Sequence, residues 1–455
     1  MVLSILSYTL LVLSLLYTSL HQVLLLFKAL GSSNGVKNGA LDQRQDTEKT
    51  LSIVIPSKNE PIDIVLDRLN RLSFMECYSE VILVLDDEIA YVNKLVSELN
   101  SRFFDKGGVV VSRLNGFGGR NGALSDGCRM ALGENVMIMD VDAIPSQSLL
   151  CNARTCSDVC VAVWEPYVEV GTRVEEGMAF ITRFGSWLFY ELRYRAGLFI
   201  YPLGSGTAID REIIRSVGFW RPDVIQDDIW LGYELLSRGI KPRLLNGHLL
   251  VSVPRTLNSA RIQQCRWSYG SVNIFSRFVG KVLRAPVKTG TKIEAIFYST
   301  QPIASLLALL AFITALPAAL LEKNLNICPA LLIPIAAAVI LQAIVLRFFC
   351  SSAYRVSLWK MVYLSGRVSA IYTVLTPLLG YSALKGLARA RYKYRITPKS
   401  LQLRRSLLDL SEIVALLLSI PTLSISIINK NAVTFIVSLP LALASLYSIV
   451  RLDKG

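Results

Sequence analysis

Long apolar stretches without a charged residue flank a segment of mixed composition, and this arrangement constrains the fold most. The uncharged stretches cover residues 3–27, 295–321, 324–346, 413–429 and 431–450. Stretches of this kind are long enough to cross a bilayer core of about 30 Å. Hydrophobic residues make up 52% of the 455 residues and charged residues only 18%. This composition therefore disfavours both a wholly soluble protein and a disordered chain.

The first apolar stretch is expected to remain in the protein. No Lys or Arg precedes it, and no small-residue cleavage site follows it. A secretory signal peptide has both features. The pattern therefore favours a retained membrane helix.

The distribution of positive charge predicts the membrane topology. Lys+Arg exceeds Asp+Glu by 48 − 34 = 14, and residues 385–405 carry many of these cations and no acid. The positive-inside rule places residues 347–405 and the mixed segment in the cytoplasm. The prediction is a multi-pass cell-membrane protein with about five spans and an outside N-terminus. The charge thus needs no nucleic-acid partner, because anionic membrane lipids account for it.

Residues 361–384 are a special case among the apolar segments, because Arg367 lies near their middle. The segment starts and ends on the cytoplasmic side, so we expect it to lie in the interface or re-enter. The alternative is a sixth span in which Arg367 faces the protein interior.

These features divide the chain into seven segments. We expect an N-terminal transmembrane helix (1–30), a polar linker (31–46), an α/β catalytic domain (47–260), an interfacial segment (261–294), a transmembrane hairpin (295–349), an interfacial helix with a basic segment (350–405) and a second transmembrane hairpin (406–455).

The mixed segment alternates between short β-branched runs and stretches of helical period. The runs are 51–55, 81–85, 109–111 and 136–139, and residues 62–72 have helical spacing. Strands that alternate with helices are typical of a parallel sheet covered on both faces. The predicted fold class is therefore α/β, with an added α-helical membrane region.

Cysteine and histidine point to no site. The eight cysteines form no framework of a small secreted domain, so reduced thiols are expected. Cys151, Cys156 and Cys160 lack a nearby fourth ligand, which favours a structural role over a metal site. Only two histidines are present, which nearly excludes a histidine-based triad.

Polar residues follow several of the predicted strands. Glu60 ends the loop after the first strand, Asp86 and Asp87 close the second, and Asp140 and Asp142 close the fourth. Ligands bind at strand carboxyl ends in open α/β sheets. Alternation in an extended chain would put Asp140 and Asp142 on one side, which suits a divalent ion that also holds a diphosphate. Solvated turns and helix caps are the alternative interpretation.

Three further motifs could contribute to a site. Small residues around Arg120 would let backbone N–H groups approach an anion. Asp227 and Asp228 stand at the start of a predicted helix. They either cap this helix, or one of them acts as a general base. Gln263, Arg266 and Trp267 offer donors and a flat stacking surface for a sugar or base, although a Trp/Arg membrane anchor is the alternative.

In this order the motifs resemble family 2 glycosyltransferases. The ordered set is IPSKNE, LDD, GGRNGALSDG, DVD, GSGTAIDREI, QDD and QQCRW, over roughly residues 50–400. The resemblance is strongest to the membrane-integrated branch of cellulose, chitin and hyaluronan synthases and ceramide glucosyltransferase. Tyr394, Ile396, Thr397 and Lys399 resemble the gating loop of the cellulose synthase group, with Tyr in place of its Phe.

This resemblance implies a Rossmann-like GT-A fold and inverting transfer from a nucleotide-activated sugar, usually UDP-linked. It implies Asp228 as the general base, although Gln226 and Asp227 depart from the family's T-E-D motif. The other implied roles are donor binding by Glu60, Asp86, Asp87, Arg120, Asp140, Thr397 and Lys399; acceptor binding by Gln263, Arg266 and Trp267; and Mg²⁺ or Mn²⁺ binding by Asp140 and Asp142.

The acceptor leaves two hypotheses open. The gating-loop and Q-x-x-R-W resemblance favours a growing polysaccharide moved through the enzyme's own helices. Five spans are few for such a channel, although an oligomer could supply more. The alternative is single transfer to a membrane lipid, such as a polyprenyl phosphate or a glycolipid. A transporter is disfavoured because, apart from Arg367, the spans lack mid-membrane charges.

Overall fold

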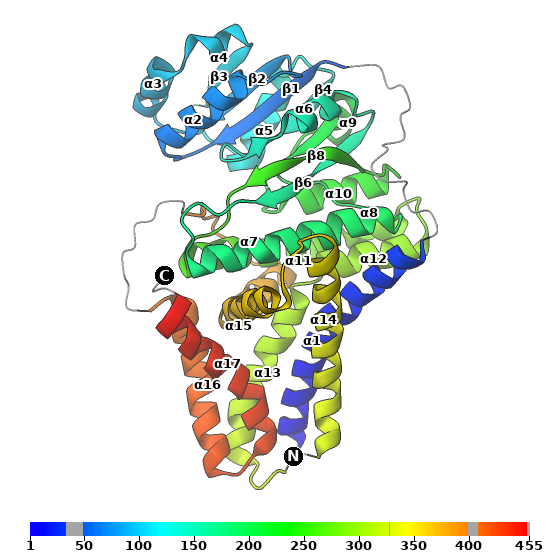
Figure 1. Cartoon of the computed structure of the whole chain (residues 1–455), viewed down its shortest axis with the longest axis vertical. Coiled ribbons are helices and arrows are strands. Elements are labelled where there is room, and N and C mark those ends of the chain that lie inside the picture. Colours follow the sequence, from blue (N-terminus) through cyan, green and yellow to red (C-terminus); the bar gives the residue numbers. More distant parts are fainter. Residues whose placement is uncertain (33–48, 114, 327, 399–407, 453–455) are drawn as a thin grey trace.

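The computed structural model describes residues 1–32, 49–113, 115–326, 328–398 and 408–452. An α/β domain lies at one end of the molecule, and a bundle of long helices at the other (Figure 1). The linker predicted at 31–46 lies almost entirely outside the described residues.

One sheet of eight strands forms the centre of the α/β domain, in the order β3-β2-β1-β4-β7-β6-β8-β5. Its strands are β1 (Leu51–Ser57), β2 (Glu80–Leu85), β3 (Gly108–Ser112), β4 (Asn135–Ile138), β5 (Ile144–Pro145), β6 (Val159–Pro166), β7 (Thr207–Asp210) and β8 (Arg243–Val251). The four predicted strands, β1 to β4, pair in parallel. The expectation of a wholly parallel sheet is wrong beyond them, because β7 runs antiparallel to both β4 and β6.

Helices cover both faces of the sheet, which explains why the strands β1, β2 and β4 are buried throughout. Alternate residues of a strand point to opposite faces. In β1, Ile53 packs with Leu69 on one face, whereas Val54 packs with Leu124 on the other. The domain helices are α2 (Ile62–Ser73), α3 (Ile89–Glu98), α4 (Ser101–Asp105), α5 (Gly119–Met130), α6 (Gln147–Arg154), α7 (Arg173–Ser186), the π-helix η1 (Trp187–Leu192), α8 (Arg193–Arg195), α9 (Arg211–Val217), α10 (Asp227–Ser237), α11 (Leu257–Arg284) and α12 (Thr289–Ser299).

Six helices are long and apolar enough to cross a membrane within the described ranges. They are α1 (Val2–Gly31), α13 (Ile303–Leu321), α14 (Leu332–Ser352) with the preceding turn η2 (Pro329–Leu331), α15 (Leu358–Leu387), α16 (Leu410–Ile428) and α17 (Ala432–Arg451). The apolar stretch at 295–321 is not one helix. The helix α12 ends at Ser299, and α13 begins at Ile303 directly after Pro302, whose missing N–H cannot continue the hydrogen bonds of a preceding helix.

The helix α15 differs from the other five in its direction. In Figure 1 it is seen nearly end-on, between the α/β domain and the bundle, whereas α1, α13, α14, α16 and α17 run along the bundle. Arg367 of α15 is buried, forms an ion pair with Glu176 of α7 and lies 4.2 Å from the centre of the Tyr363 ring. Its charge is therefore neutralised by the α/β domain.

The helix α12 joins the α/β domain to α1. Glu294 accepts a hydrogen bond from the fully buried Arg193 at 2.6 Å, and His21 of α1 lies 3.3 Å from the same carboxylate. The Arg193 guanidinium also lies 4.5 Å from the centre of the Tyr298 ring. These contacts fix the first long helix against the sheet domain.

Replacing Arg193 by methionine is expected to lower the free energy of unfolding by about 3–5 kcal/mol, because Glu294 keeps a buried charge and loses the guanidinium that neutralises it, with His21 still beside it. Thermal unfolding in detergent, followed by tryptophan fluorescence, measures the loss. The double variant Arg193→Met/Glu294→Gln is expected to recover part of it. Equal stability of the single variant and the wild type would contradict the buried pair.

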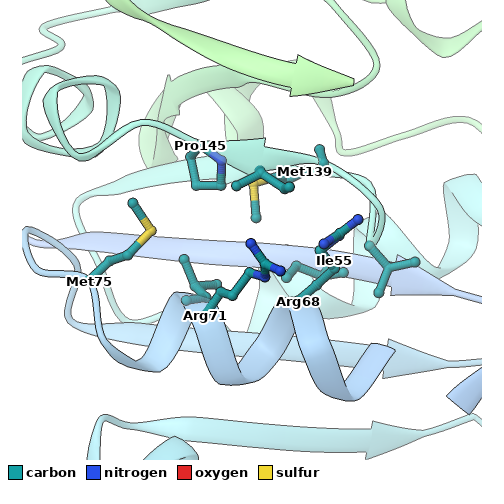
Figure 2. Close-up of a pocket in the computed structure, with 10 residues that line it drawn as sticks. Ile55, Arg68, Arg71, Met75, Met139 and Pro145 are labelled. Carbon is teal, nitrogen blue, oxygen red and sulfur yellow. The ribbon is translucent and has the colours of Figure 1, made fainter. Parts of the chain in front are cut away.

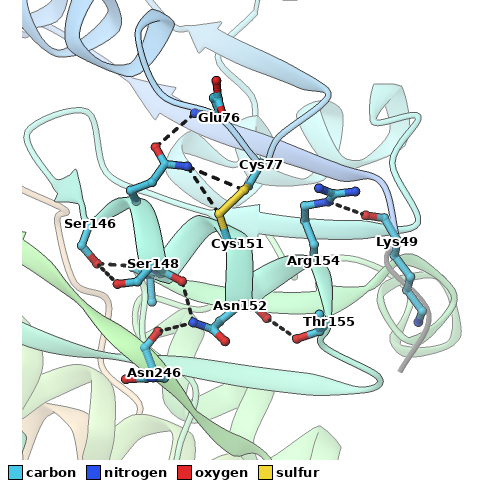
Figure 3. Close-up of a disulfide and its surroundings, with 12 residues drawn as sticks. Lys49, Glu76, Cys77, Ser146, Ser148, Cys151, Asn152, Arg154, Thr155 and Asn246 are labelled. Atoms are coloured by element: carbon cyan, nitrogen blue, oxygen red, sulfur yellow. Dashed lines mark hydrogen bonds between the residues drawn. A yellow bond between two sulfur atoms is a disulfide. The ribbon is translucent and has the colours of Figure 1, made fainter. Parts of the chain in front are cut away.

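Four cysteines form disulfides, so the expectation of reduced thiols is wrong for them. Cys77 bonds Cys151, and Cys156 bonds Cys160. Figure 3 shows that Cys151 lies on α6 and reaches the loop that carries Cys77. The Gln147 side chain donates to both sulfurs. Spacing along the chain could not predict this pairing, because the two partners are 74 residues apart.

Reduction of the Cys77–Cys151 bond is expected to destabilise the α/β domain by about 4 kcal/mol, the chain-entropy value for a loop of this length. The measurement is the midpoint of thermal unfolding of Cys151→Ser against the wild type, with and without dithiothreitol. The exposed free thiol Cys328 provides a control variant, Cys328→Ser, which should not change the midpoint. A wild-type midpoint that ignores dithiothreitol would refute the prediction.

Candidate active site

Two cavities adjoin the carboxyl end of β1, and they differ greatly in size. The smaller, about 10 Å³, lies between α2 and the chain near β5, with Arg68 and Arg71 facing Met139 and Pro145 (Figure 2). It has room for about one water molecule. The larger has a volume of about 690 Å³. Only the larger could hold a ligand of nucleotide size.

Most of the predicted site residues line this larger cavity. They are Glu60, Arg120, Asp140, Asp142, Asp227, Asp228, Gln263, Arg266, Trp267 and Thr397. They come from the ends of β1 and β4, the starts of α5 and α10, the first turns of α11 and the segment after α15. Lys399 lies outside the described residues.

Asp140 and Asp142 both reach the cavity, but not through strand alternation. The strand β4 ends at Ile138, and the two carboxylates follow in a turn. The Asp140 N–H donates to Ser205 Oγ at 2.9 Å, and Ser252 Oγ donates to Asp142 Oδ2 at 2.5 Å. The predicted juxtaposition is therefore present, and hydrogen bonds within the turn region produce it.

These two carboxylates fit a divalent metal ion that is shared with a ligand. Within the described ranges no cluster of three or more His, Cys, Asp or Glu could hold a metal by itself. Mg²⁺ and similar hard ions, however, bind through one or two carboxylates and complete their coordination with phosphate and water oxygens. The Asp140 side chain is 45% exposed, beside a cavity with room for phosphates. The donor set therefore suits Mg²⁺ or Mn²⁺ together with a diphosphate.

Arg120 lies between the acidic groups of the site. It donates to Asp227 Oδ2 at 2.5 Å and to Asp140 Oδ1 at 2.9 Å, and also to the Gly204 carbonyl. Burial lowers the pKa of Arg120, but the two carboxylates outweigh it and the net pKa is raised. The side chain is thus a permanent cation at the centre of the cavity wall.

Glycine is required where the chain turns into α5. Gly118 has a φ of +75°, and a Cβ there would approach the Pro222 Cβ to 2.9 Å. A larger residue would be strained by the left-handed backbone and by this contact. The close packing places Arg120, in the first turn of α5, against α10.

The two aspartates that open α10 have different surroundings. Asp227 is buried and neutralised by Arg120, whereas Asp228 is half-buried and its Oδ1 accepts the Ile229 N–H at 2.7 Å. Burial, followed by the charge of Asp227, raises the pKa of Asp228 to about 7. Asp228 is therefore the better proton acceptor.

Gln263, Arg266 and Trp267 lie along one side of α11, as helical spacing predicts, and face the segment after α15. Arg266 donates to the Tyr394 hydroxyl at 3.1 Å and lies 5.1 Å from the centre of its ring. Thr397 also lines the cavity, and its hydroxyl has no hydrogen-bond partner among the described residues. This wall therefore presents a cation and an indole to a ligand, and the Thr397 hydroxyl beside them is buried.

Asp86 and Asp87 are not among the residues that line the cavity. The Asp86 side chain is 3% exposed and pairs with Arg113 at 2.6 Å. Asp87 accepts the Asn59 N–H at 2.6 Å. Their predicted role at the donor stays a prediction.

Sequence reasoning missed several residues that support the site. Arg113 ties Asp86 to Asp126, and its ion pair with Asp126 measures 2.8 Å. Ser205 and Ser252 bond the Asp140–Asp142 turn. Ser205 lies in the GSGTAID motif, next to a strand, and this position could have identified it as a site residue. Arg113 and Ser252 lie in no motif.

Comparisons with known proteins concern the family and the fold of the chain. The model described as glycosyl transferase family group 2 matches residues 135–384, and that of glycosyl transferase family 2 matches residues 52–217. A probable glycosyltransferase of Sulfolobus acidocaldarius is 28% identical over 373 residues, which cover 77% of each chain. A mannosyltransferase from Pyrobaculum calidifontis, solved in complex with GDP-Man and Mn²⁺, has a TM-score of 0.55 at 17% identity, over 84% of this chain and 100% of its own. At this identity the likeness establishes a common fold.

Proposed function

Because this chain belongs to glycosyl transferase family group 2, we propose that it transfers a sugar, with inversion, from a nucleotide-sugar donor to an acceptor at a membrane. It is a glycosyltransferase, and its sheet domain has the expected GT-A-like fold. We also propose that the chain belongs to the branch of membrane-integrated synthases within this family. The observation that carries the proposal is the shared cavity of Asp228, Arg120 and the Asp140–Asp142 turn.

The chemistry follows from the positions of these groups. Asp228 accepts the proton of the acceptor hydroxyl while that oxygen attacks the anomeric carbon from the side opposite the leaving group. The bond between the anomeric carbon and the phosphate oxygen breaks, and its electron pair leaves with the nucleoside diphosphate. Arg120 and Arg266 contribute positive charge near this diphosphate. A divalent ion held by Asp140 and Asp142 supplies further charge neutralisation when bound.

The donor is proposed to be a UDP-sugar. The mannosyltransferase from Pyrobaculum calidifontis was solved with GDP-Man, which makes a GDP-sugar the principal competitor. The purified protein is incubated with each of a panel of UDP- and GDP-sugars, with Mg²⁺ or Mn²⁺ and membrane lipid extract. Release of the nucleoside diphosphate identifies the donor. Calorimetric titration with UDP and GDP separates a missing acceptor from a wrong assignment, because binding needs no acceptor.

The helix bundle provides an observation on the acceptor. Apolar side chains of α13, α15, α16 and α17 form one buried cluster at its centre, including Ala311, Ile371, Ala415 and Val437. Such packing favours an acceptor that reaches the cavity along the membrane surface, and so a membrane lipid. A growing polysaccharide is the second candidate, favoured by the Arg266–Trp267 wall. Polymeric product after prolonged incubation with donor would identify the polysaccharide synthase.

The proposed topology has five spans, an outside N-terminus and a cytoplasmic catalytic domain. Two observations support an interfacial position for α15: it lies across the end of the bundle, and its Arg367 pairs with Glu176 of the α/β domain. Cysteines introduced at Lys323 and Lys430, on the two hairpin turns, test this arrangement. In intact cells both should react with a thiol reagent that cannot cross the membrane.

A further inference from the structure

A run of cations leads from the end of α15 to the catalytic cavity. It consists of Lys385, Arg389, Arg391, Lys393 and Arg395. The last four are exposed. None of the five belongs to an ion pair between described residues, whereas cations elsewhere, such as Arg261 and Arg277, pair with carboxylates. Five uncompensated charges within eleven residues form a strongly positive surface.

The same region carries an apolar surface on α15. Tyr381, Leu384 and Leu387 are exposed and recur every three residues, so they share one face of the helix. At the other end of α15, Trp359 is 83% exposed. Tryptophan and tyrosine concentrate at the membrane–water interface. With α15 lying across the end of the bundle (Figure 1), these side chains mark the plane of the lipid headgroups.

The cationic run continues directly into the cavity wall. Tyr394, Ile396, Thr397 and Pro398 line the cavity, and Tyr394 is held by Arg266 of α11. The stacking of Tyr392 on Tyr269, with ring centres 4.4 Å apart, attaches the middle of the run to the same helix. A ligand that binds the cations would therefore restrain the residues that close one side of the site.

We propose that the run Lys385–Arg395 binds the headgroups of anionic membrane lipids and that this binding holds Tyr394–Pro398 against the catalytic cavity. Each Lys or Arg near an anionic membrane surface adds about fivefold to the affinity. The adjoining apolar face of α15 favours a lipid surface over a soluble polyanion, which would gain nothing from it. The effect on catalysis rests on the proposed function, whereas lipid binding does not.

Limited trypsin cleavage tests the binding without any turnover. The full-length protein is reconstituted into phosphatidylcholine vesicles with and without phosphatidylglycerol, and cleavage after Arg395 is followed by mass spectrometry. We expect cleavage to be at least about tenfold slower with the anionic lipid, and the protection to weaken as salt is raised. Equal cleavage rates in the two vesicles would overturn the proposal. Equal protection by RNA in detergent at the same ionic strength would also overturn it, in favour of a nucleic-acid surface.

A double variant isolates the contribution of the run. Arg391→Gln/Lys393→Gln removes two exposed cations and leaves the cleavage site at Arg395. The variant should lose most of the protection given by phosphatidylglycerol. The matched control Lys94→Gln/Lys106→Gln changes the net charge equally near α3 and α4, at the far end of the domain (Figure 1), and should keep it. Equal losses in both variants would show that net charge alone is responsible, which contradicts a site.

The catalytic arm compares sugar transfer in the two vesicle types. We expect phosphatidylglycerol to lower the KM for the donor severalfold in the wild type and in the Lys94→Gln/Lys106→Gln control. The KM of Arg391→Gln/Lys393→Gln should not respond to the lipid. Absent turnover of every donor in all proteins would count against the proposed function, while the protection assay still decides lipid binding. Protection without any change in KM would overturn the restraint of the cavity wall.

Discussion

Replacing Asp228 by asparagine is expected to lower the turnover number by about 10²–10⁴-fold, the usual contribution of a general base. Asp228 lines the cavity, whereas its neighbour Asp227 is already paired with Arg120 at 2.5 Å. The donor KM should change little, because the base acts on the acceptor hydroxyl. Steady-state release of the nucleoside diphosphate at saturating acceptor measures the loss. The exposed Asp105 gives the control variant, Asp105→Asn, which should turn over at the wild-type rate.

The pH profile provides a second measurement on the same residue. The carboxyl must be ionised to accept a proton, and its pKa is raised to about 7 by burial and by Asp227. Turnover should therefore rise as the pH increases through neutrality and level off above it. Arg120 acts in the opposite direction and lowers the pKa of Asp228, whereas the Asp228 charge contributes to the raised pKa values of Tyr190 and Tyr298. The rising limb should be absent from the residual activity of Asp228→Asn.

Stability distinguishes a lost base from a misfolded protein. A carboxyl whose pKa is raised on folding contributes stability that is fully present below its ordinary pKa and is lost as the pH rises through the raised value. At pH 8 the wild type therefore contains an unfavourable ionised group that Asp228→Asn lacks. The variant should unfold at the same or a higher temperature. An inactive variant that unfolds earlier would leave the role of base unsupported, and an active one would refute it.

Removing the divalent metal ion, or its ligand Asp142, is expected to reduce turnover by at least about 10²-fold. A bound divalent ion contributes several kcal/mol to the stabilisation of a leaving diphosphate. The assay is turnover after treatment with EDTA, followed by titration with Mg²⁺ or Mn²⁺. Asp142→Asn should need more metal for half-maximal rate, and Asp158→Asn, at an exposed position away from the cavity, should behave as the wild type.

Donor binding supplies a readout of the metal site that is independent of turnover. Calorimetry should show that UDP binds the wild type more tightly with Mn²⁺ than with EDTA. In Asp142→Asn this difference should largely disappear, because a neutral amide replaces one of the two carboxylates that hold the metal ion. Full turnover of the EDTA-treated wild type would exclude the metal site at Asp140 and Asp142.

Local pattern predicted much of the domain that carries the site. The four β-branched runs became β1 to β4, because an apolar strand needs both faces covered wherever it lies in the chain. The helical spacing of Gln263 and Trp267 placed both on the cavity side of α11. The order of motifs along the chain was enough to predict the glycosyltransferase family, and the match over residues 135–384 confirms this prediction. These inferences depend on contacts within a turn or a strand, which a short sequence window contains.

Pairing between distant residues was decided by the tertiary structure alone. The choice between Asp227 and Asp228 rests on Arg120, which is 107 residues earlier than its partner Asp227. The same holds for the Cys77–Cys151 bond, for the pairing of Asp86 with Arg113 and for the antiparallel place of β7. The sequence determined which residue types follow each strand and how far apart they stand along the chain. Only the folded chain decided which of them meet, because a contact across many residues depends on how whole elements pack and leaves no period in the local sequence.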